Sequence, residues 1–306
     1  MRTLTRRRFL TISAGAAALA VAPRARADDL YVWRGTALGA EAVIRLPRGA
    51  DAAQTAAGAA AEIARLEAIF SLYRADSSLT ALNRAGRLDA PPPELLDCLS
   101  VVSRVHAASR GLFDPTIQPL WALYAERYAA GLAPDPAAIS AALALTGWPR
   151  AQFDETRVTL APGMALTLNG IAQGYIADRI TALLRAAGHS DILVNTGEYR
   201  ALGGLPSGGD WPVTLAGSDR QVALRDRALA TSAPLGTTFD AGQSVGHILD
   251  PRSGRPAAAR WRSVSISAPQ AAVADALSTA ACLMQDRAEI SRCLAAFADA
   301  RLEDLA

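Results

Sequence analysis

Residues 166–180 read LTLNGIAQGYIADRI, and this stretch decides how we interpret the fold of the chain. Its first residues are apolar and β-prone as far as Asn169 and Gly170, and the residues from Tyr175 onward have helical apolar spacing. We therefore expect a strand that turns sharply into a helix, with Gly170 and Gly174 allowing the backbone to approach a ligand. The N–H groups at the start of such a helix attract anions, although an ordinary strand-to-helix turn explains the same pattern.

Strands and helices are mixed along the rest of the chain without strict alternation. This mixture predicts an α/β or α+β fold in which helices flank a mixed sheet. With 306 residues, of which 51% are hydrophobic, the chain has enough apolar area for one large domain or two closely joined ones. Apolar periodicity predicts helices over 51–70, 94–109, 121–128, 135–145, 175–187 and 271–284, and strands over 31–36, 41–46, 158–160, 192–194, 213–216, 221–224, 228–231 and 262–267.

The first 27 residues have the composition of an export signal. A basic segment, Arg6-Arg7-Arg8-Phe9-Leu10, precedes an apolar run that is too short to span a bilayer, and Ala25-Arg26-Ala27 forms a cleavage site. Paired arginines before Phe-Leu resemble a twin-arginine signal, which predicts a mature domain over 28–306 in the periplasm. An uncleaved anchor or an ordinary secretory signal is the alternative.

Charge and cysteine content exclude other classes of function. The formal net charge is +2 and no basic block occurs outside the N-terminus, so we expect no nucleic-acid binding. The three cysteines, Cys98, Cys282 and Cys293, lack metal-ligand spacing, and two of them lie in apolar helical patterns. We therefore expect buried thiols and no disulfide.

The helix predicted over 271–284 carries a candidate metal site. Asp275 and Thr279 are four residues apart, so their oxygens lie on one face of the helix. A carboxylate and a hydroxyl at that distance can hold a hard cation such as Mg²⁺. The alternative is that Asp275 caps the first turn while Thr279 bonds back to a helix carbonyl.

One histidine is a candidate general base. The chain has three histidines: His106 lies on a predicted helix, His189 lies in a helix-ending turn, and His247 lies in a polar loop. A neutral imidazole in such a loop can accept a proton near neutral pH. A solvent-exposed histidine without a catalytic role explains the pattern equally well.

An aromatic residue in another polar loop is a candidate ligand contact. Tyr73 follows the first long helix, within FSLYRADSS, and its ring can stack against a planar ligand. The same segment can instead cap the next helix through Asp76 or Ser77.

Taken together, these segments resemble one family. FSLYRADSSLTALN, the Phe-Asp-Pro-Thr turn at 113–116, LNGIAQGYIAD, TGEYRALGG, HILDPRSGRP and ADALSTA occur in the order and spacing of the ApbE family, the FAD:protein FMN transferases. The resemblance runs from about Trp33 to Met284. The segment 166–180 and the twin-arginine signal are most similar to those of the NosX branch, which is associated with nitrous oxide reduction.

The resemblance implies an ApbE-like flavin transferase fold and a specific reaction. Family members cleave the pyrophosphate of FAD with Mg²⁺ and attach FMN through a phosphoester to a Thr or Ser of an acceptor flavoprotein, here expected to be NosR-like and membrane-bound. By resemblance, Gly170, Asp275 and Thr279 hold the metal, and His247 and Asp275 carry catalysis. The positions that resemble those around FAD in the family are Leu38, Tyr73, Leu112, Phe113, Asp114, Thr167, Gln173 and Ile248.

Three of these positions depart from the family pattern. Leu38 replaces a common Met, Thr167 replaces an Asp that contacts FAD, and Gln173 replaces a Lys or Glu, so Gln173 can form hydrogen bonds but carries no charge. Two alternatives to the transferase therefore stay open. One is an FAD pyrophosphatase that releases FMN and AMP, and the other is a flavin-binding protein or scaffold without turnover.

Overall fold

An antiparallel sheet forms the centre of the molecule. The computed structural model describes residues 29–215 and 219–306, so the predicted signal peptide lies outside the described residues. The sheet has seven strands in the order β1-β2-β6-β7-β10-β11-β12, and each neighbouring pair is antiparallel. Its strands are β1 (Leu30–Ala37), β2 (Ala40–Pro47), β6 (Ile192–Asn195), β7 (Tyr199–Leu202), β10 (Ala228–Ser232), β11 (Val264–Ala268) and β12 (Arg301–Leu305).

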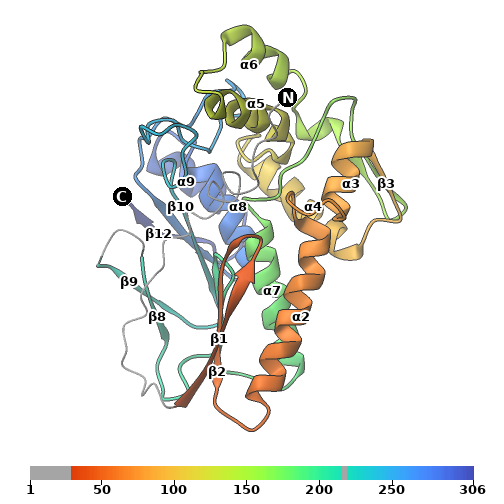
Figure 1. The fold of residues 1–306 in the computed structure, drawn as a ribbon. Helices are drawn as coiled ribbons and strands as arrows, with labels where there is room; N and C mark the ends of the chain where they lie inside the picture. The colour runs from red at the N-terminus through yellow and green to blue at the C-terminus, as the bar shows by residue number, and fades with distance from the viewer. Residues whose placement is uncertain (1–28, 216–218) are drawn as a thin grey trace.

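Helices and smaller sheets surround this centre (Figure 1). The helices are α2 (Ala52–Phe70), α3 (Ser78–Ala85), α4 (Pro93–Ala108), α5 (Gln118–Ala129), α6 (Pro136–Leu143), α7 (Ala172–Ala186), α8 (Ala271–Ala281) and α9 (Arg287–Leu294), with 3-10 turns η2 (Pro115–Ile117) and η3 (Trp148–Arg150). The small sheets are β3 (Arg87–Asp89), β4 (Gln152–Phe153) and β5 (Arg157–Thr159), and the hairpin β8 (Trp211–Thr214) with β9 (Gln221–Leu224). The predicted combination of a sheet with flanking helices is confirmed. The fold mixes strands with helices, but the strands of the central sheet all pair in the antiparallel direction.

Both faces of the central sheet are covered. In β6, Ile192 and Val194 point into the main core, where α2, α7 and α8 pack against the sheet, and Leu193 points into a second core with Trp211 of the β8–β9 hairpin. Because side chains alternate along a strand, an uninterrupted apolar run is what a strand covered on both faces requires. A third, small core lies under α5 and α6, at the top of Figure 1.

Most of the expected elements form, with shifts of a few residues at their ends. The segment 166–180, expected to be a strand that turns into a helix, differs from the prediction in its first part. Residues 166–169 are not a strand, because the side-chain amide of Asn83 bonds both backbone groups of Leu166, at 2.7 and 2.8 Å. The backbone N–H of Thr167 donates to the carbonyl of Pro115 at 2.8 Å. These partners replace the neighbouring strand that the segment would otherwise need.

Gly174 serves helix packing, and the prediction that it allows a ligand to approach was wrong. It lies inside α7 and faces the start of α8, where a Cβ would come within 2.3 Å of the carbonyl oxygen of Ala271. On the same face of α7, the carboxylate of Asp178 accepts hydrogen bonds from the backbone N–H groups of Ala271 and Ala272, at 2.9 and 3.0 Å. The N-terminus of α8 is therefore capped by a side chain of α7.

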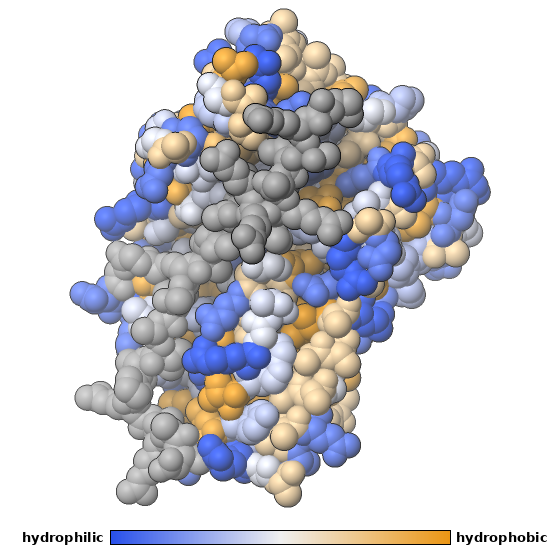
Figure 2. Space-filling model, in the orientation of Figure 1, coloured by the Kyte–Doolittle hydropathy of each residue, from blue (hydrophilic) through white to orange (hydrophobic). Residues whose placement is uncertain are grey.

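The surface carries few large apolar side chains. In Figure 2 the pale region over α2 corresponds to exposed alanines of that helix, Ala53, Ala57, Ala61 and Ala64. No helix among the described residues is long and apolar enough to cross a membrane. The three cysteines are buried and unpaired, as expected.

Replacing Gly174 with alanine tests the helix contact. Because the added methyl group would meet backbone atoms, we expect Gly174→Ala to lower the free energy of unfolding by about 2 kcal/mol or more. Gly58→Ala is the matched control, since nothing lies within 4 Å of a Cβ at Gly58, and it should stabilise the exposed helix α2 by about 0.5–1 kcal/mol. Urea unfolding measures both changes, and equal effects would contradict the packing role.

Candidate active site

A cavity of about 690 Å³ lies where α7, α8, the loop before η2 and the loop after β10 meet. This volume is within the usual range of small-molecule sites. With the exception of Tyr73, every residue predicted for the site lines the cavity. The predicted residues that line it are Leu38, Leu112, Phe113, Asp114, Thr167, Gly170, Gln173, His247, Ile248, Asp275 and Thr279.

Tyr73 is the predicted residue that the structure does not place on the cavity wall. It lies in the turn after α2, where the hydroxyl oxygen of Ser71 accepts hydrogen bonds from the backbone N–H groups of Tyr73 and Arg74. The hydroxyl of Ser77 accepts from the N–H of Thr80 and caps α3. The alternative that this segment caps the next helix is therefore confirmed for Ser77.

Asp275 and Thr279 form one corner of the cavity. The Asp275 side chain is buried, at 4% exposure, and its carboxylate accepts one backbone hydrogen bond, from Gly174 at 3.2 Å. A Cβ on Gly170 would lie 3.0 Å from the hydroxyl oxygen of Thr279, so that backbone closes the corner. The Ser232 hydroxyl lies 3.3 Å from the Thr279 hydroxyl.

This donor set suits a hard cation. It supplies a carboxylate, a hydroxyl and a nearby backbone, which are oxygen donors of the kind that Mg²⁺ prefers. Within residues 29–215 and 219–306, no cluster of three or more His, Cys, Asp or Glu side chains has metal-binding geometry. A metal at Asp275 would therefore keep positions for water or substrate oxygens.

A second buried carboxylate, Glu198, lines the same cavity. It precedes β7 and accepts a hydrogen bond from the backbone N–H of Thr231 at 3.2 Å. Burial raises the pKa of Glu198 well above its ordinary value, and the negative charge of Asp275 raises it further. Burial likewise raises the pKa of Asp275 to about 7, so this corner holds protons when no cation is bound.

His247 reaches the cavity from a loop, and it is partly buried rather than fully solvent-exposed. Its Nδ1 lies 2.9 Å from the carbonyl oxygen of Thr237, and its backbone N–H donates to the same oxygen at 3.1 Å. Because a carbonyl oxygen only accepts, Nδ1 carries the hydrogen and Nε2 keeps the lone pair. Burial lowers the pKa of His247, so the imidazole is neutral at pH 7.

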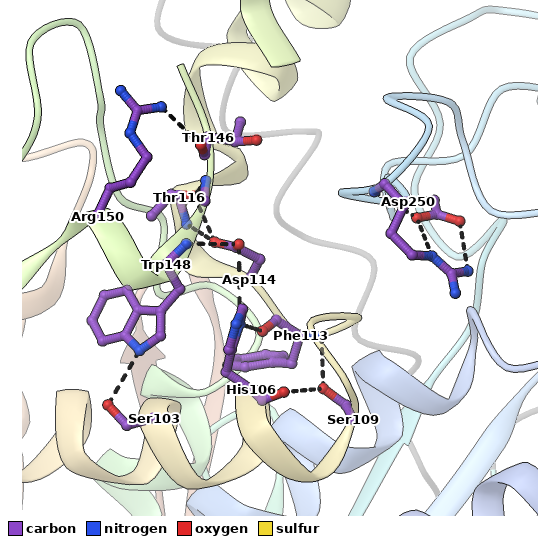
Figure 3. Close-up of polar contacts among 12 residues, drawn as sticks. Ser103, His106, Ser109, Phe113, Asp114, Thr116, Thr146, Trp148, Arg150 and Asp250 are labelled. Atoms are coloured by element: carbon purple, nitrogen blue, oxygen red, sulfur yellow. Dashed lines mark hydrogen bonds and ion pairs between the residues drawn. The ribbon is translucent and has the colours of Figure 1, made fainter. Parts of the chain in front are cut away.

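Asp114 is held by the protein itself (Figure 3). Its side chain is 5% exposed, and its oxygens accept from the backbone and hydroxyl of Thr116 and from the backbone N–H of Trp148, at 2.8, 2.5 and 2.9 Å. Nδ1 of His106 lies 2.9 Å from the carbonyl oxygen of Phe113. The carboxylate therefore fixes the turn that carries Phe113, while its direct contact with FAD stays a prediction.

Gln173 occupies a tightly packed place. Its side-chain amide lies against Gly197, where a Cβ would come within 2.5 Å, and φ at Gly197 is +105°. The hydroxyl of Thr196 donates to the backbone carbonyl of Gln173 at 2.8 Å. The amide of Gln173 is therefore a closely packed, uncharged group on the cavity wall.

Sequence reasoning missed Glu198, Ser232 and Arg262 as cavity residues. Glu198 lies within TGEYRALGG, one of the segments on which the family resemblance rests, so its presence there was the available signal. Ser232 ends β10 and Arg262 lies two residues before β11, and neither carries a local pattern. Only the pairing of β10 with β11 brings them to the cavity.

Comparison with known proteins identifies the family. Residues 35–299 match the model of the ApbE family, which is most of the chain. The chain belongs to the ApbE family. The sequence-based resemblance is thereby confirmed, and the NosX branch stays a prediction.

Named relatives in this family are flavin transferases. The chain is 33% identical over 210 residues to an FAD:protein FMN transferase from Klebsiella pneumoniae (strain 342); the match covers 63% of this chain and 64% of that protein, just under two thirds of its length. It is 28% identical to the apo flavinyl transferase ApbE from Pseudomonas stutzeri (TM-score 0.75, covering 87% of this chain and 88% of that one). The ApbE protein from Thermotoga maritima is 27% identical (TM-score 0.77, covering 85% and 89%).

The buried carboxylate at 275 predicts a pH-dependent stability without metal. The unfolded carboxyl releases its proton near 3.8 and the folded one near 7, so the unfolded state binds fewer protons between these values. In chelator, the free energy of unfolding should therefore fall as pH rises from 4 to 7, by on the order of 2 kcal/mol. Urea unfolding at pH 5 and pH 8 measures this loss.

Asp275→Asn is the test variant for that loss. It should lose less stability than the wild-type protein over the same pH interval, and the remaining slope is expected from Glu198, whose pKa is also raised. Added Mg²⁺ should restore wild-type stability at pH 8 by binding the ionised form. Equal slopes for the two proteins would show that Asp275 does not titrate in this range.

Proposed function

We propose that this protein is a Mg²⁺-dependent FAD:protein FMN transferase. It would cleave the pyrophosphate of FAD and attach FMN through a phosphoester to a Thr or Ser of an acceptor flavoprotein. The observation that carries the proposal is that one cavity joins the buried Asp275 and the neighbouring Thr279 to the imidazole of His247. The flavin transferase names of the relatives support the same reaction.

The imidazole of His247 acts as the base in this proposal. Its Nε2 takes the proton of the acceptor hydroxyl, and the hydroxyl oxygen forms a bond to the phosphorus of the FMN half. The bond from that phosphorus to the bridging oxygen breaks, and AMP leaves with the electron pair. The contact of Nδ1 with Thr237 holds the ring in the tautomer that this transfer requires.

Asp275 and Thr279 are the side chains that would hold Mg²⁺ beside the pyrophosphate. When bound there, Mg²⁺ supplies Lewis-acid neutralisation of charge on the phosphate oxygens. Burial of Asp275 bears on this arrangement, because it raises the pKa of the carboxyl to about 7 and a bound cation would favour the ionised form. Ser232, whose hydroxyl lies 3.3 Å from that of Thr279, orients the second ligand.

The location and the acceptor belong to the same proposal. The twin-arginine pattern of residues 1–27 supports export of the folded protein to the periplasm. The acceptor would be a flavoprotein whose Thr or Ser can enter the cavity, and a NosR-like membrane flavoprotein is the partner that the NosX resemblance favours. An FAD pyrophosphatase would give FMN and AMP without an acceptor, so product analysis without acceptor separates the two reactions.

Acceptor labelling tests the transfer. The purified protein is incubated with FAD, Mg²⁺ and a candidate acceptor domain, and covalent flavin is read as fluorescence on a denaturing gel. We expect labelling by the wild type, none in chelator, and a loss of at least about a hundredfold for Asp275→Asn, because charge on the phosphates would no longer be neutralised.

Asp299→Asn is the matched control for this experiment. Asp299 lies outside the cavity lining and has φ of +57°, a conformation that asparagine tolerates. The control should label the acceptor at the wild-type rate. Wild-type labelling by Asp275→Asn, or tight FAD binding with neither hydrolysis nor transfer by the native protein, would overturn the proposed function.

The pH at which the transfer rate falls on the acidic side tests the role of His247 as the base. Because burial lowers the pKa of His247, the ring stays neutral below the ordinary value of 6.5. With Mg²⁺ saturating, the rate of transfer should therefore stay level as pH falls to 6.5 and should drop only at lower pH. His247→Asn should lose about 10²–10⁴-fold in kcat, whereas His189→Asn, outside the cavity lining, should not. An acidic limb centred at or above 6.5 would contradict this assignment.

A further inference from the structure

The acidic side chains that line the cavity outnumber its basic ones. Three carboxyl groups, those of Asp114, Glu198 and Asp275, face a single Arg or Lys side chain, that of Arg262, among the described lining residues. The full sequence contains no lysine, so each of its 31 basic residues is an arginine. A pyrophosphate-bearing substrate entering this cavity would therefore meet one guanidinium group of the protein.

Hydrogen bonds hold the backbone on both sides of Arg262. Its N–H donates to the carbonyl oxygen of Ala306 at 2.6 Å, and the backbone of Ser263 bonds to Ala306 in both directions, at 3.4 and 3.1 Å. On the other side, the indole N–H of Trp261 donates to the carbonyl of Met284 at 3.1 Å. The residues on both sides of Arg262 are thus anchored, so the base of its side chain is held at the cavity rim.

The guanidinium of Arg262 is not occupied by a carboxylate. Within the described residues no acidic side chain forms an ion pair with it, in contrast to many surface arginines such as Arg252, which pairs with Asp250 at 2.9 Å. Arg260, two residues earlier, donates to the side chain of Gln285 at 3.0 Å and does not line the cavity. Arg262 therefore has donors to offer to a ligand.

Strand pairing places Arg262 at the same end of the cavity as Thr279. Ser232 of β10 is opposite Val264 of β11, so the chain that enters β11 through Arg262 runs beside the end of β10. The hydroxyl of Ser232 lies 3.3 Å from that of Thr279. The oxygen corner and the backbone of Arg262 therefore belong to one part of the wall, and the exposed side chain of Arg262 extends from there with phosphate oxygens within its reach.

We propose that Arg262 binds the pyrophosphate of the dinucleotide substrate and thereby selects phosphorylated flavins over riboflavin. This inference rests on the proposed function and adds a residue to it. A guanidinium presents parallel N–H donors that match two phosphate oxygens. In the transfer step the bond between the FMN phosphorus and the bridging oxygen breaks, and the resulting negative charge on the departing AMP phosphate lies within the part of the cavity that Arg262 serves.

Ligand discrimination tests the proposal. Dissociation constants of FAD and of riboflavin are measured by flavin fluorescence in chelator, so that neither a metal ion nor turnover contributes. We expect Arg262→Gln to weaken FAD binding about tenfold, because a charge-assisted hydrogen bond is lost at a partly solvated site, and to leave riboflavin binding unchanged. Arg260→Gln is the matched control: it makes the same charge change two residues away and should alter neither constant.

The other outcomes overturn the proposal. Unchanged FAD binding by Arg262→Gln would show that the guanidinium does not contact phosphate, and equal weakening of both ligands would show that Arg262 only supports the wall. Arg262→Lys should bind FAD more tightly than Arg262→Gln but less tightly than the wild type, because lysine keeps the positive charge and lacks the planar pair of N–H donors. A native protein that binds FAD but labels no acceptor would overturn the proposed function alone, since the comparison of FAD with riboflavin stays readable.

Discussion

The close contact between α7 and α8 is the constraint on which the site depends. Gly174 has no side chain, and the carbonyl of Ala271 occupies the space where a Cβ would lie. Asp178, one turn further along α7, bonds the first two N–H groups of α8 and pairs with Arg200 at 3.3 Å. These contacts fix the start of α8 against α7. They also bury Asp275, which lies one turn into α8 and accepts the N–H of Gly174.

Burial of Asp275 links the packing to the chemistry. A carboxylate deprived of water is costly unless a positive charge compensates it, and the only neutralising contact here is one peptide N–H. The same contact that stabilises the helix pair therefore creates a carboxyl with a pKa near 7 and a strong preference for a cation. Packing and metal affinity are two consequences of one close approach. The base, in contrast, comes from a loop and depends on the Thr237 carbonyl for its orientation.

Regular periodicity explains what the sequence could predict. The long helix α2 and the strands β1 and β2 have strong patterns, and the motifs placed Asp275, Thr279, Gly170 and His247 on one site before the structure did so. The sequence-based prediction was wrong where a side chain, rather than a neighbouring strand, forms the hydrogen bonds of the backbone. Residues 166–169 were expected to be a strand because their apolar pattern is β-like, but the amide of Asn83 satisfies the backbone there. The short elements α9 and β12 were not predicted, since a few residues give little periodicity, and α3 was anticipated only through the capping alternative at Asp76 or Ser77.

The residues that the sequence could not assign are those whose role depends on distant neighbours. Asp114 resembles a ligand contact in sequence, yet the backbone N–H of Trp148, 34 residues away, occupies one of its oxygens. Arg262 has no motif around it and acquires a role only because β10 and β11 pair. In a cavity whose acidic groups outnumber its arginines and whose Gln173 carries no charge, an anionic dinucleotide would be stabilised by positive charge that enters with it or that the wall supplies. A cation at Asp275 and the guanidinium of Arg262, both proposed, would supply that charge on one part of the wall and would leave the apolar residues Leu38 and Phe113 for the flavin ring.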